Sequence, residues 1–351
     1  MKKKKIFIIL ILLILLILGV FIIFLISKNV SKMQKEIKKE TVKENSPKPK
    51  PKEERENKKE EKPLSKPEES LSKEKPIPKE NKVNTVNLNN YHGKAYMIID
   101  RKYDKVLLKR NEHMQISPAS LTKLYLIAYV NTFCSLDEEV LVTREVLNTV
   151  KKGSSLAYLK LKKYSVRNLY EALLLPSGND AAYVLATYAG SKLNKEAKTV
   201  AEKKAALLRG LNEYLKANHY NDTVIYDPSG FDLNTKTSAY DLKKISDHLL
   251  KIDWFRYLTS QDDYRATLPD GTFQYWKTAN EFIDKKSKHY HPNVSGTKTG
   301  SIKGAYNIVT LYNKYHKEFL VISLGSSSED TRYVDTRVLL SIIDNHKELA
   351  K

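Results

Sequence analysis

The sequence predicts an α/β fold of the α+β type, with one antiparallel sheet flanked by helices and a helical subdomain inserted across a cleft. Strand-like segments lie near both ends of the predicted folded region, at 94–109 and 295–326. Helical segments dominate from 118 to about 258, and a last helix is expected from about 330 to 349. When both ends of a domain supply strands, those strands can form one sheet, with the intervening helices packed beside it.

Residues 6–26 form an uncharged apolar segment that is long enough to span a bilayer. The segment has 21 residues, and a membrane-spanning helix needs about 20. A cleaved signal peptide would have a shorter apolar core, followed by small residues at a cleavage site, whereas Ser27-Lys28-Asn29 follows here. We therefore expect a transmembrane signal anchor at 6–26, after a cytoplasmic tail at 1–5, in preference to a cleaved signal.

Residues 27–85 are predicted to be a disordered tether. Between 28 and 82 the chain has 18 Lys or Arg, 12 Glu, seven of its twelve prolines and no aromatic residue. Such a composition cannot bury enough apolar surface to fold. The tether would join the anchor to a folded domain at 86–351, which begins with a hairpin at 94–109.

Three short motifs inside the folded region carry the candidate chemistry. They are Ser-Leu-Thr-Lys at 120–123, Ser-Gly-Asn at 177–179 and Lys-Thr-Gly at 298–300. Together they supply a hydroxyl nucleophile, an adjacent amine, a hydroxyl-plus-amide pair and a cationic strand edge, which suits serine acyl transfer without histidine. The first two patterns recur elsewhere in the chain, so their placement in suitable elements decides the interpretation.

The first motif begins a predicted buried helix. Residues 121–133 are apolar on nearly every face, which is typical of a helix at the centre of a domain, and Pro118 suits a first turn. Lys123 follows Ser120 by three residues, so the amine and the hydroxyl share one face. Because burial lowers the proton affinity of an ammonium, Lys123 is a candidate base for a nucleophilic Ser120.

The second motif lies in a tight loop between two predicted helices. One helix ends before Pro176 and the next begins near Asp180. An ordinary turn followed by a helix cap has the same local pattern, so this loop is not specific by itself. Combined with the other motifs, Ser177 is a candidate proton relay to a leaving amine, and Asn179 a candidate donor to a substrate carbonyl.

The third motif lies in a predicted strand that is interrupted by glycines, including Gly300. Glycine within a strand often marks close approach of a ligand backbone, and a peptide could add itself to such an edge. Lys298 and Thr299 then offer a cation and a hydroxyl to a terminal carboxylate. The backbone N–H groups of Ser120 and Ser301 are expected to form an oxyanion hole.

These motifs and their surroundings resemble the serine D-alanyl-D-alanine carboxypeptidases among the low-molecular-mass penicillin-binding proteins. The resemblance runs from about residue 94 to the C-terminus. It includes Ile-Ser-Pro-Ala-Ser-Leu-Thr-Lys, Pro-Ser-Gly-Asn-Asp-Ala-Ala, Asp-Pro-Ser-Gly-Phe-Asp at 227–232, Thr-Ser-Ala-Tyr-Asp-Leu at 237–242 and Gly-Thr-Lys-Thr-Gly. It implies a DD-peptidase/β-lactamase-like fold.

The resemblance also implies roles for the matched residues. Ser120 would be acylated with Lys123 as its base, Ser177 and Asn179 would relay protons and position substrate, and Lys298 and Thr299 would hold the substrate carboxylate. The implied reaction trims the terminal D-alanine from peptidoglycan stem pentapeptides, and the implied inhibitors are β-lactams. No metal or other cofactor is expected. The same motifs serve carboxypeptidases, endopeptidases and transpeptidases, so these alternatives stay open.

Two departures from many relatives are expected. No β-rich domain would follow the catalytic domain, and the membrane segment is N-terminal rather than a C-terminal amphipathic anchor. Lysines flank residues 6–26 on both sides, so charge counting does not set the orientation, and large domains can translocate regardless. Because the implied substrate lies outside the membrane, we expect a single-pass membrane protein with an extracytoplasmic catalytic domain.

Two other functions compete with this interpretation. A serine β-lactamase shares all three motifs but needs a deacylating glutamate after the second one, and Glu196, Glu202 and Glu213 lie in Lys- and Ala-rich helical contexts. A penicillin-sensing or peptidoglycan-binding module would be acylated without turnover. It would need a cytoplasmic signalling partner, and the predicted cytoplasmic tail has only five residues.

Charge and composition narrow the possible partners. The chain carries a net charge of +20, of which about +10 falls on residues 83–351, so the folded domain could be attracted to anionic wall polymers or lipid head groups. Nucleic-acid binding is not expected, because no recognised motif accompanies the charge. Cys134 is the only cysteine, which excludes an intrachain disulfide. His289 and His291 lack an evident third metal ligand.

Overall fold

The structure is a computed structural model that describes residues 88–345. The predicted tail at 1–5, anchor at 6–26 and tether at 27–85 lie outside the described residues, as do the first two residues of the predicted domain and the end of its last helix. Among residues 88–345, no helix combines the length and apolar character that crossing a membrane requires.

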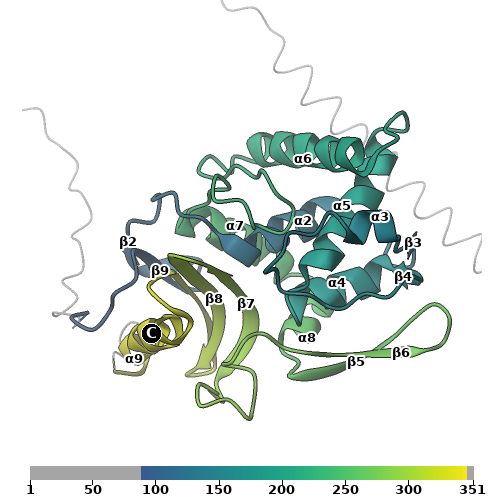
Figure 1. The fold of residues 1–351 in the computed structure, drawn as a ribbon. Helices are drawn as coiled ribbons and strands as arrows, with labels where there is room; N and C mark the ends of the chain where they lie inside the picture. Colours follow the sequence, from purple (N-terminus) through teal and green to yellow (C-terminus); the bar gives the residue numbers. More distant parts are fainter. Residues whose placement is uncertain (1–87, 346–351) are drawn as a thin grey trace, which may run out of the picture. The chain divides into compact units, whose positions relative to one another are not determined.

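A five-stranded antiparallel sheet joins the two ends of the described chain (Figure 1). Its order is β2-β1-β9-β8-β7, which places β7 at one edge. The strands are β1 (Ala95–Asp100), β2 (Lys105–Arg110), β7 (Val294–Ile302), β8 (Ala305–Lys314) and β9 (Lys317–Ser326). The predicted sheet, built from strands at both ends of the domain, is confirmed.

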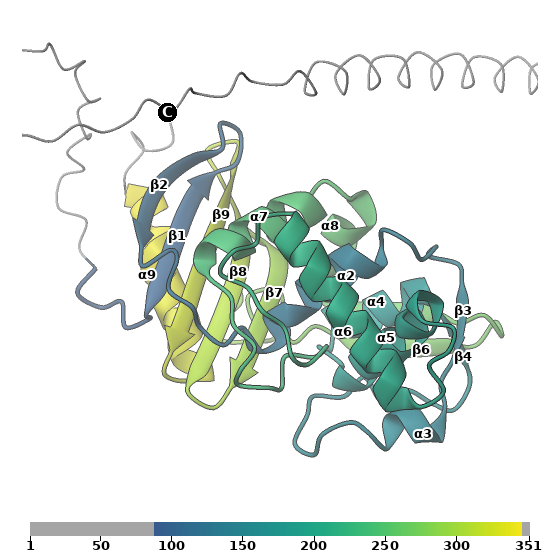
Figure 2. The same cartoon turned by 90° about the horizontal axis from the view of Figure 1, so that it is seen from above.

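Each face of this sheet buries its own apolar core. Along β9, Phe319 and Val321 belong to one cluster while Leu320 and Ile322 belong to the other, as the two-residue period of a strand requires. The first cluster packs against α9 (Glu329–Asn345), and the second faces the helical part of the domain (Figure 2). The helix expected from about 330 is therefore present on the outer face of the sheet.

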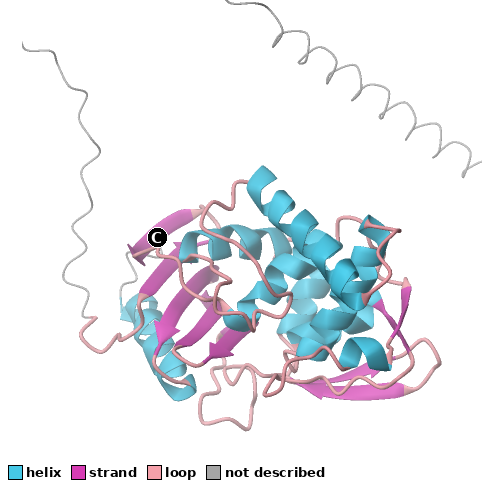
Figure 3. Cartoon of the chain, turned by 45° about the horizontal axis from the view of Figure 1, so that its top comes forward, coloured by secondary structure: helices cyan, strands magenta, loops and turns pink. Residues whose placement is uncertain are grey.

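The helical part lies between β2 and β7 in sequence, as predicted. Figure 3 shows most of the helices gathered on one side of the large sheet. The helical part also contains two small antiparallel pairs, β3 with β4 and β5 with β6. Its helices are η1 (Ala119–Leu121), α2 (Thr122–Val130), α3 (Arg144–Leu147), α4 (Val166–Leu174), α5 (Asn179–Leu193), α6 (Val200–Ala217), α7 (Ala239–Leu249) and α8 (Asp253–Thr259). The short strands are β3 (Glu139–Leu141), β4 (Lys163–Ser165), β5 (Asp263–Thr267) and β6 (Phe273–Lys277).

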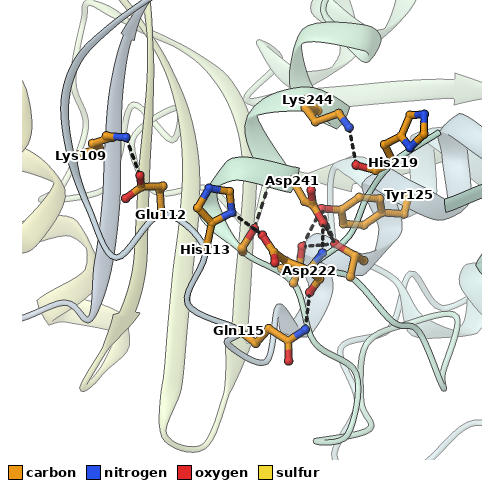
Figure 4. Close-up of polar contacts among 12 residues, drawn as sticks. Lys109, Glu112, His113, Gln115, Tyr125, His219, Asp222, Asp241 and Lys244 are labelled. Atoms are coloured by element: carbon orange, nitrogen blue, oxygen red, sulfur yellow. Dashed lines mark hydrogen bonds and ion pairs between the residues drawn. The ribbon is translucent and has the colours of Figure 1, made fainter. Parts of the chain in front are cut away.

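Helix α2 is the buried centre of this region, although it ends at Val130, earlier than the predicted Phe133. A network of polar side chains holds α2 at Tyr125 (Figure 4). The hydroxyls of Tyr125 and Thr237 lie 2.6 Å apart, and Thr223 Oγ1 lies 2.9 Å from Thr237 Oγ1 while donating to Asp241 at 2.7 Å. Residues two positions apart on an α-helix point in directions that differ by roughly 200° around its axis. A helix held at Tyr125 therefore presents Lys123 on the opposite side.

Candidate active site

The first motif brings a hydroxyl and an amine into direct contact. Ser120 lies in the 3-10 turn η1, and Lys123 lies in the first turn of α2. The Lys123 Nζ donates a 2.8 Å hydrogen bond to Ser120 Oγ, and the Lys123 side chain is 0% exposed. The spacing of three residues therefore places the two groups on one face, as predicted.

Two glycines let distant backbone approach the segment that carries Ser120. A Cβ at Gly230 would collide with the carbonyl oxygen of Ala119, and one at Gly300 would collide with the carbonyl oxygen of Pro118. Ala119 itself has a φ of 50°, in the left-handed region that costs a non-glycine residue about 1 kcal/mol or more. The backbone just before Ser120 is thus held in an unfavourable conformation by contacts from two distant parts of the chain.

The second motif closes over the amine. Asn179 is the first residue of α5, and its Oδ1 accepts a 2.7 Å hydrogen bond from Lys123 Nζ. The backbone N–H of Asn179 donates to the carbonyl of Ser155, which fixes the start of the helix. Ser177 lies in the loop between α4 and α5 with a φ of 61° and is buried.

The third motif reaches the same place from the sheet. Lys298 lies on the edge strand β7, is 1% exposed, and donates 2.8 Å and 3.0 Å hydrogen bonds to Ser177 Oγ and the carbonyl of Thr299. Thr299 is buried beside it. The predicted convergence of the three motifs is therefore present as a set of direct contacts.

The buried amines have lowered proton affinities. Burial lowers the pKa of Lys123 to about 7, although the carboxylates of Asp227 and Asp180 act to raise it. Burial, together with the positive charges of Lys123 and Arg332, lowers the pKa of Lys298 well below its ordinary value. At neutral pH a substantial fraction of Lys123 is a neutral amine that can accept a proton.

Two further groups complete the site and were not identified from the sequence. The backbone carbonyl of Ser229 accepts a 3.1 Å hydrogen bond from Lys123 Nζ. Arg332, buried at the start of α9, donates to Ser301 Oγ at 2.7 Å and toward the carbonyl of Gly300 at 3.4 Å. Ser229 belongs to the Asp-Pro-Ser-Gly segment noted in the family resemblance, whereas Arg332 belongs to none of the motifs used.

The two histidines considered as metal ligands have other contacts. His289 Nε2 lies 2.9 Å from Asp330 Oδ1, and His291 Nδ1 accepts from the backbone N–H of Asn293 at 3.3 Å. In residues 88–345, no three His, Cys, Asp or Glu side chains are grouped as metal ligation would need.

Comparisons with known proteins identify the family. The family profile described as "D-alanyl-D-alanine carboxypeptidase" matches residues 82–326. The D-alanyl-D-alanine carboxypeptidase DacD of Escherichia coli is 29% identical over 261 residues, covering 71% of this chain and 62% of that protein. The DacD protein of Salmonella typhimurium is 30% identical over 258 residues, covering 70% and 61%. The chain thus matches less than two thirds of the length of these relatives.

Solved structures have the same fold. The Streptomyces K15 DD-transpeptidase superposes with a TM-score of 0.63 at 23% identity, covering 71% of this chain and 95% of that one, which supports the fold alone. Penicillin-binding protein 6B from Escherichia coli gives a TM-score of 0.60 at 27% identity, covering 76% and 80%. The fold places the chain in the structural class of these DD-transpeptidase and penicillin-binding protein structures. Within that class, the chain belongs to the D-alanyl-D-alanine carboxypeptidase family.

Proposed function

We propose that the chain is a serine D-alanyl-D-alanine carboxypeptidase that removes the terminal D-alanine from peptidoglycan stem pentapeptides. The observation that carries this proposal is the position of Lys123 Nζ, 2.8 Å from Ser120 Oγ and 2.7 Å from Asn179 Oδ1. A buried amine with a pKa of about 7 is a base suited to neutral pH. Family membership and the names of the relatives support the same reaction.

The proposed acylation step uses the first motif. Lys123 takes the proton of the Ser120 hydroxyl while Oγ forms a bond to the carbonyl carbon of the penultimate D-alanine. The carbonyl oxygen becomes an oxyanion, and the backbone N–H groups of Ser120 and Ser301 would stabilise it by about 3 kcal/mol per donor. Asn179 would hold the Lys123 amine in place and donate its amide N–H to a substrate carbonyl.

Release of D-alanine requires a proton on its nitrogen. Lys298 Nζ donates to Ser177 Oγ, so the hydroxyl hydrogen of Ser177 is free to be donated to the leaving amine. Lys123, protonated by the first step, would pass that proton to Ser177 Oγ, so that Ser177 is again a hydroxyl and Lys123 is again a neutral amine. Water then attacks the Ser120 ester, with Lys123 as the base again, and releases the shortened peptide.

The proposed carboxylate site follows from two buried basic side chains, Lys298 and Arg332. Lys298 donates hydrogen bonds to Ser177 Oγ and a backbone carbonyl, and Arg332 donates to Gly300 O, Ser301 Oγ and Tyr333 Oη. All of these are uncharged oxygens, and Arg332 Nε has no partner among the described residues. Burial and the nearby positive charges favour the neutral form of Lys298. A substrate carboxylate beside Thr299 would supply the anionic partner that favours its charged form and would pair with Arg332.

A β-lactamase is the less favoured alternative. Glu196, Glu202 and Glu213, the acids considered for deacylation, are all exposed. Glu202 accepts the backbone N–H groups of Lys198 and Thr199 at the start of α6, which is a capping role. The acid next to the second motif, Asp180, accepts the N–H groups of Ala157 and Leu159.

The full chain in detergent tests this proposal. We expect covalent labelling by a fluorescent penicillin and release of one D-alanine from a muramyl pentapeptide, both lost in Ser120→Ala. Ser295→Ala, which changes the serine of another Ser-x-x-Lys sequence, should keep both activities. Stable labelling without D-alanine release would indicate a sensor, rapid penicillin hydrolysis a β-lactamase, and release that needs an acceptor amine a transpeptidase. Each of these would overturn the proposal.

We also propose that residues 6–26 anchor the protein in the cell membrane with the catalytic domain outside the cytoplasm. The support is the uncharged apolar segment in the sequence and the extracytoplasmic position of the proposed substrate. A protease added to spheroplasts should digest the catalytic domain and leave a membrane-associated N-terminal fragment. Full protection of the domain would contradict this orientation.

A further inference from the structure

A buried carboxylate organises the turn that contacts the catalytic lysine. Asp227 is 5% exposed, and its Oδ1 accepts from the Ser229 hydroxyl at 2.5 Å, the Ser229 N–H at 2.9 Å and the Phe231 N–H at 3.1 Å. Its Oδ2 accepts from Tyr183 Oη on α5 at 2.6 Å. Four donors therefore fix this side chain and the turn that follows it.

This turn contacts the catalytic motif at two points. The Ser229 carbonyl accepts from Lys123 Nζ at 3.1 Å, and Gly230 approaches the carbonyl of Ala119 so closely that no Cβ fits. A shift of the turn would move both the acceptor that orients the amine and the backbone before Ser120. The hydrogen bonds to Asp227 are thus connected to the orientation of Lys123 through one residue.

Asp227 also acts on Lys123 through its charge. Burial favours its protonated form, but the hydrogen bonds from Ser229, Tyr183 and Phe231 outweigh burial and hold the pKa of Asp227 below its ordinary value. The carboxylate is therefore ionised at neutral pH. It raises the pKa of Lys123 against the effect of burial, which is the larger of the two.

A surface lysine partly balances this carboxylate. Lys151 Nζ lies 3.9 Å from Asp227 Oδ2, and its side chain is 44% exposed. Lys204 Nζ lies 4.3 Å from the ring centroid of Tyr183, the residue that donates to the same oxygen. The positive charge of Lys151 therefore lies near the buried carboxylate of Asp227, and that of Lys204 lies near its hydrogen-bond donor Tyr183.

We propose that Asp227 is a positioning residue that sets both the orientation and the protonation state of Lys123. Lys151 partly offsets the negative charge of Asp227. This inference rests on the proposed function, in which neutral Lys123 is the base for Ser120. The charged groups that act on Lys123, on Lys298, or on Asp227 and its donor Tyr183 come from several elements. They are Asp227 and Asp180, whose charges act on Lys123, then Lys298 and Arg332 on the sheet side, and Lys151, Lys204 and Asp232 around Asp227 and Tyr183.

The pH profile of acylation tests the charge effect. Asp227→Asn keeps an oxygen acceptor for Ser229 and Phe231 but removes the negative charge. We expect the midpoint of the rise in acylation rate to move down by about 0.5 pH unit or more, so that at pH 6 the variant is labelled about 2.5-fold faster than wild type. Lys151→Met should move the midpoint upward. Glu139→Gln, which removes an exposed carboxylate paired with Lys163, should leave it unchanged.

A second variant tests the orientation effect. Asp227→Ala removes both carboxylate oxygens that accept from Ser229, Phe231 and Tyr183, and we expect acylation to fall about tenfold or more even on the high-pH plateau, where Lys123 is neutral in all variants. Thermal melting of each variant identifies any that fail to fold. Unchanged midpoints in both Asp227→Asn and Lys151→Met would overturn the charge effect, and a wild-type plateau in Asp227→Ala would overturn the orientation effect.

A direct readout separates this inference from the proposed function. If the wild type is not acylated, the proposed function fails, and the ¹³Cε resonance of Lys123, assigned with Lys123→Met, is titrated instead. The same downward and upward shifts of its midpoint in Asp227→Asn and Lys151→Met are expected. Equal midpoints in all three proteins would overturn the inference even if D-alanine release is observed.

Discussion

Lys123 shows how burial can turn a lysine into a base. Its amine has three hydrogen-bond acceptors, Ser120 Oγ, Asn179 Oδ1 and Ser229 O, and none of them is a charged oxygen. A carboxylate in direct contact would keep the ammonium protonated, whereas neutral acceptors orient it without that effect. Asp227 and Asp180 act from further away and only partly oppose burial. The result is an amine that titrates near neutral pH.

This residue-scale account predicts the pH dependence of acylation. Burial lowers the pKa of Lys123 to about 7, and the neutral form is the base, so the rate should rise with pH through about 7 and then level off. The second-order rate constant for labelling by a fluorescent penicillin, measured from pH 5 to 9, checks this. A rate that falls across this range would remove Lys123 from the role of base.

Substitution of Lys123 should reduce the rate of acylation. Lys123→Ala removes the base and should slow acylation by about 100-fold or more. A lysine variant that labels at the wild-type rate would contradict the assignment, and circular dichroism would verify that the variant is folded.

At the scale of elements, close backbone contacts hold the helical part together. Helices α5 and α6 meet at Gly190, where an added Cβ would collide with the carbonyl of Lys203 on α6. Backbone cannot move aside as a flexible side chain can, so the interface needs glycine there. Since α5 begins at Asn179, this contact supports the element that carries one acceptor of Lys123.

Gly190→Ala should therefore destabilise the domain despite the better helix propensity of alanine. We expect a loss of about 1–3 kcal/mol in the free energy of unfolding. Gly210→Ala is the matched control, because its Cβ would meet side-chain atoms of Tyr129 and Leu193 rather than backbone, and helix propensity would offset part of that cost. Thermal unfolding that ranks Gly190→Ala as no less stable than the control would contradict this account.

At the scale of the molecule, much of the architecture could be predicted from sequence pattern. Strands at both ends of the domain implied one sheet, and the last helix covers its outer face as α9. The three motifs were predicted to meet, and the contacts of Lys123 with Asn179 and of Lys298 with Ser177 bring them together. Local pattern sufficed because each motif lies in a distinct kind of element.

Other features of the site could not be predicted from the sequence. The acceptor supplied by Ser229 is a backbone carbonyl, which every residue carries, so only the folded turn singles it out. Arg332 is one basic residue in a helix with a mixed pattern, and its position beside Ser301 depends on how α9 packs on the sheet. The pairing of β3 with β4 also escaped prediction, because strands of three residues carry little periodicity.

The most direct test is to locate the acyl-enzyme in the full chain. The protein is incubated with a β-lactam, digested, and its peptides are sequenced by mass spectrometry. We predict one penicilloyl adduct, on the Ser120 side chain, present in Ser295→Ala and absent in Ser120→Ala. An adduct on another residue, or D-alanine release that persists in Ser120→Ala, would contradict the claim that the three motifs form one serine acyl-transfer site.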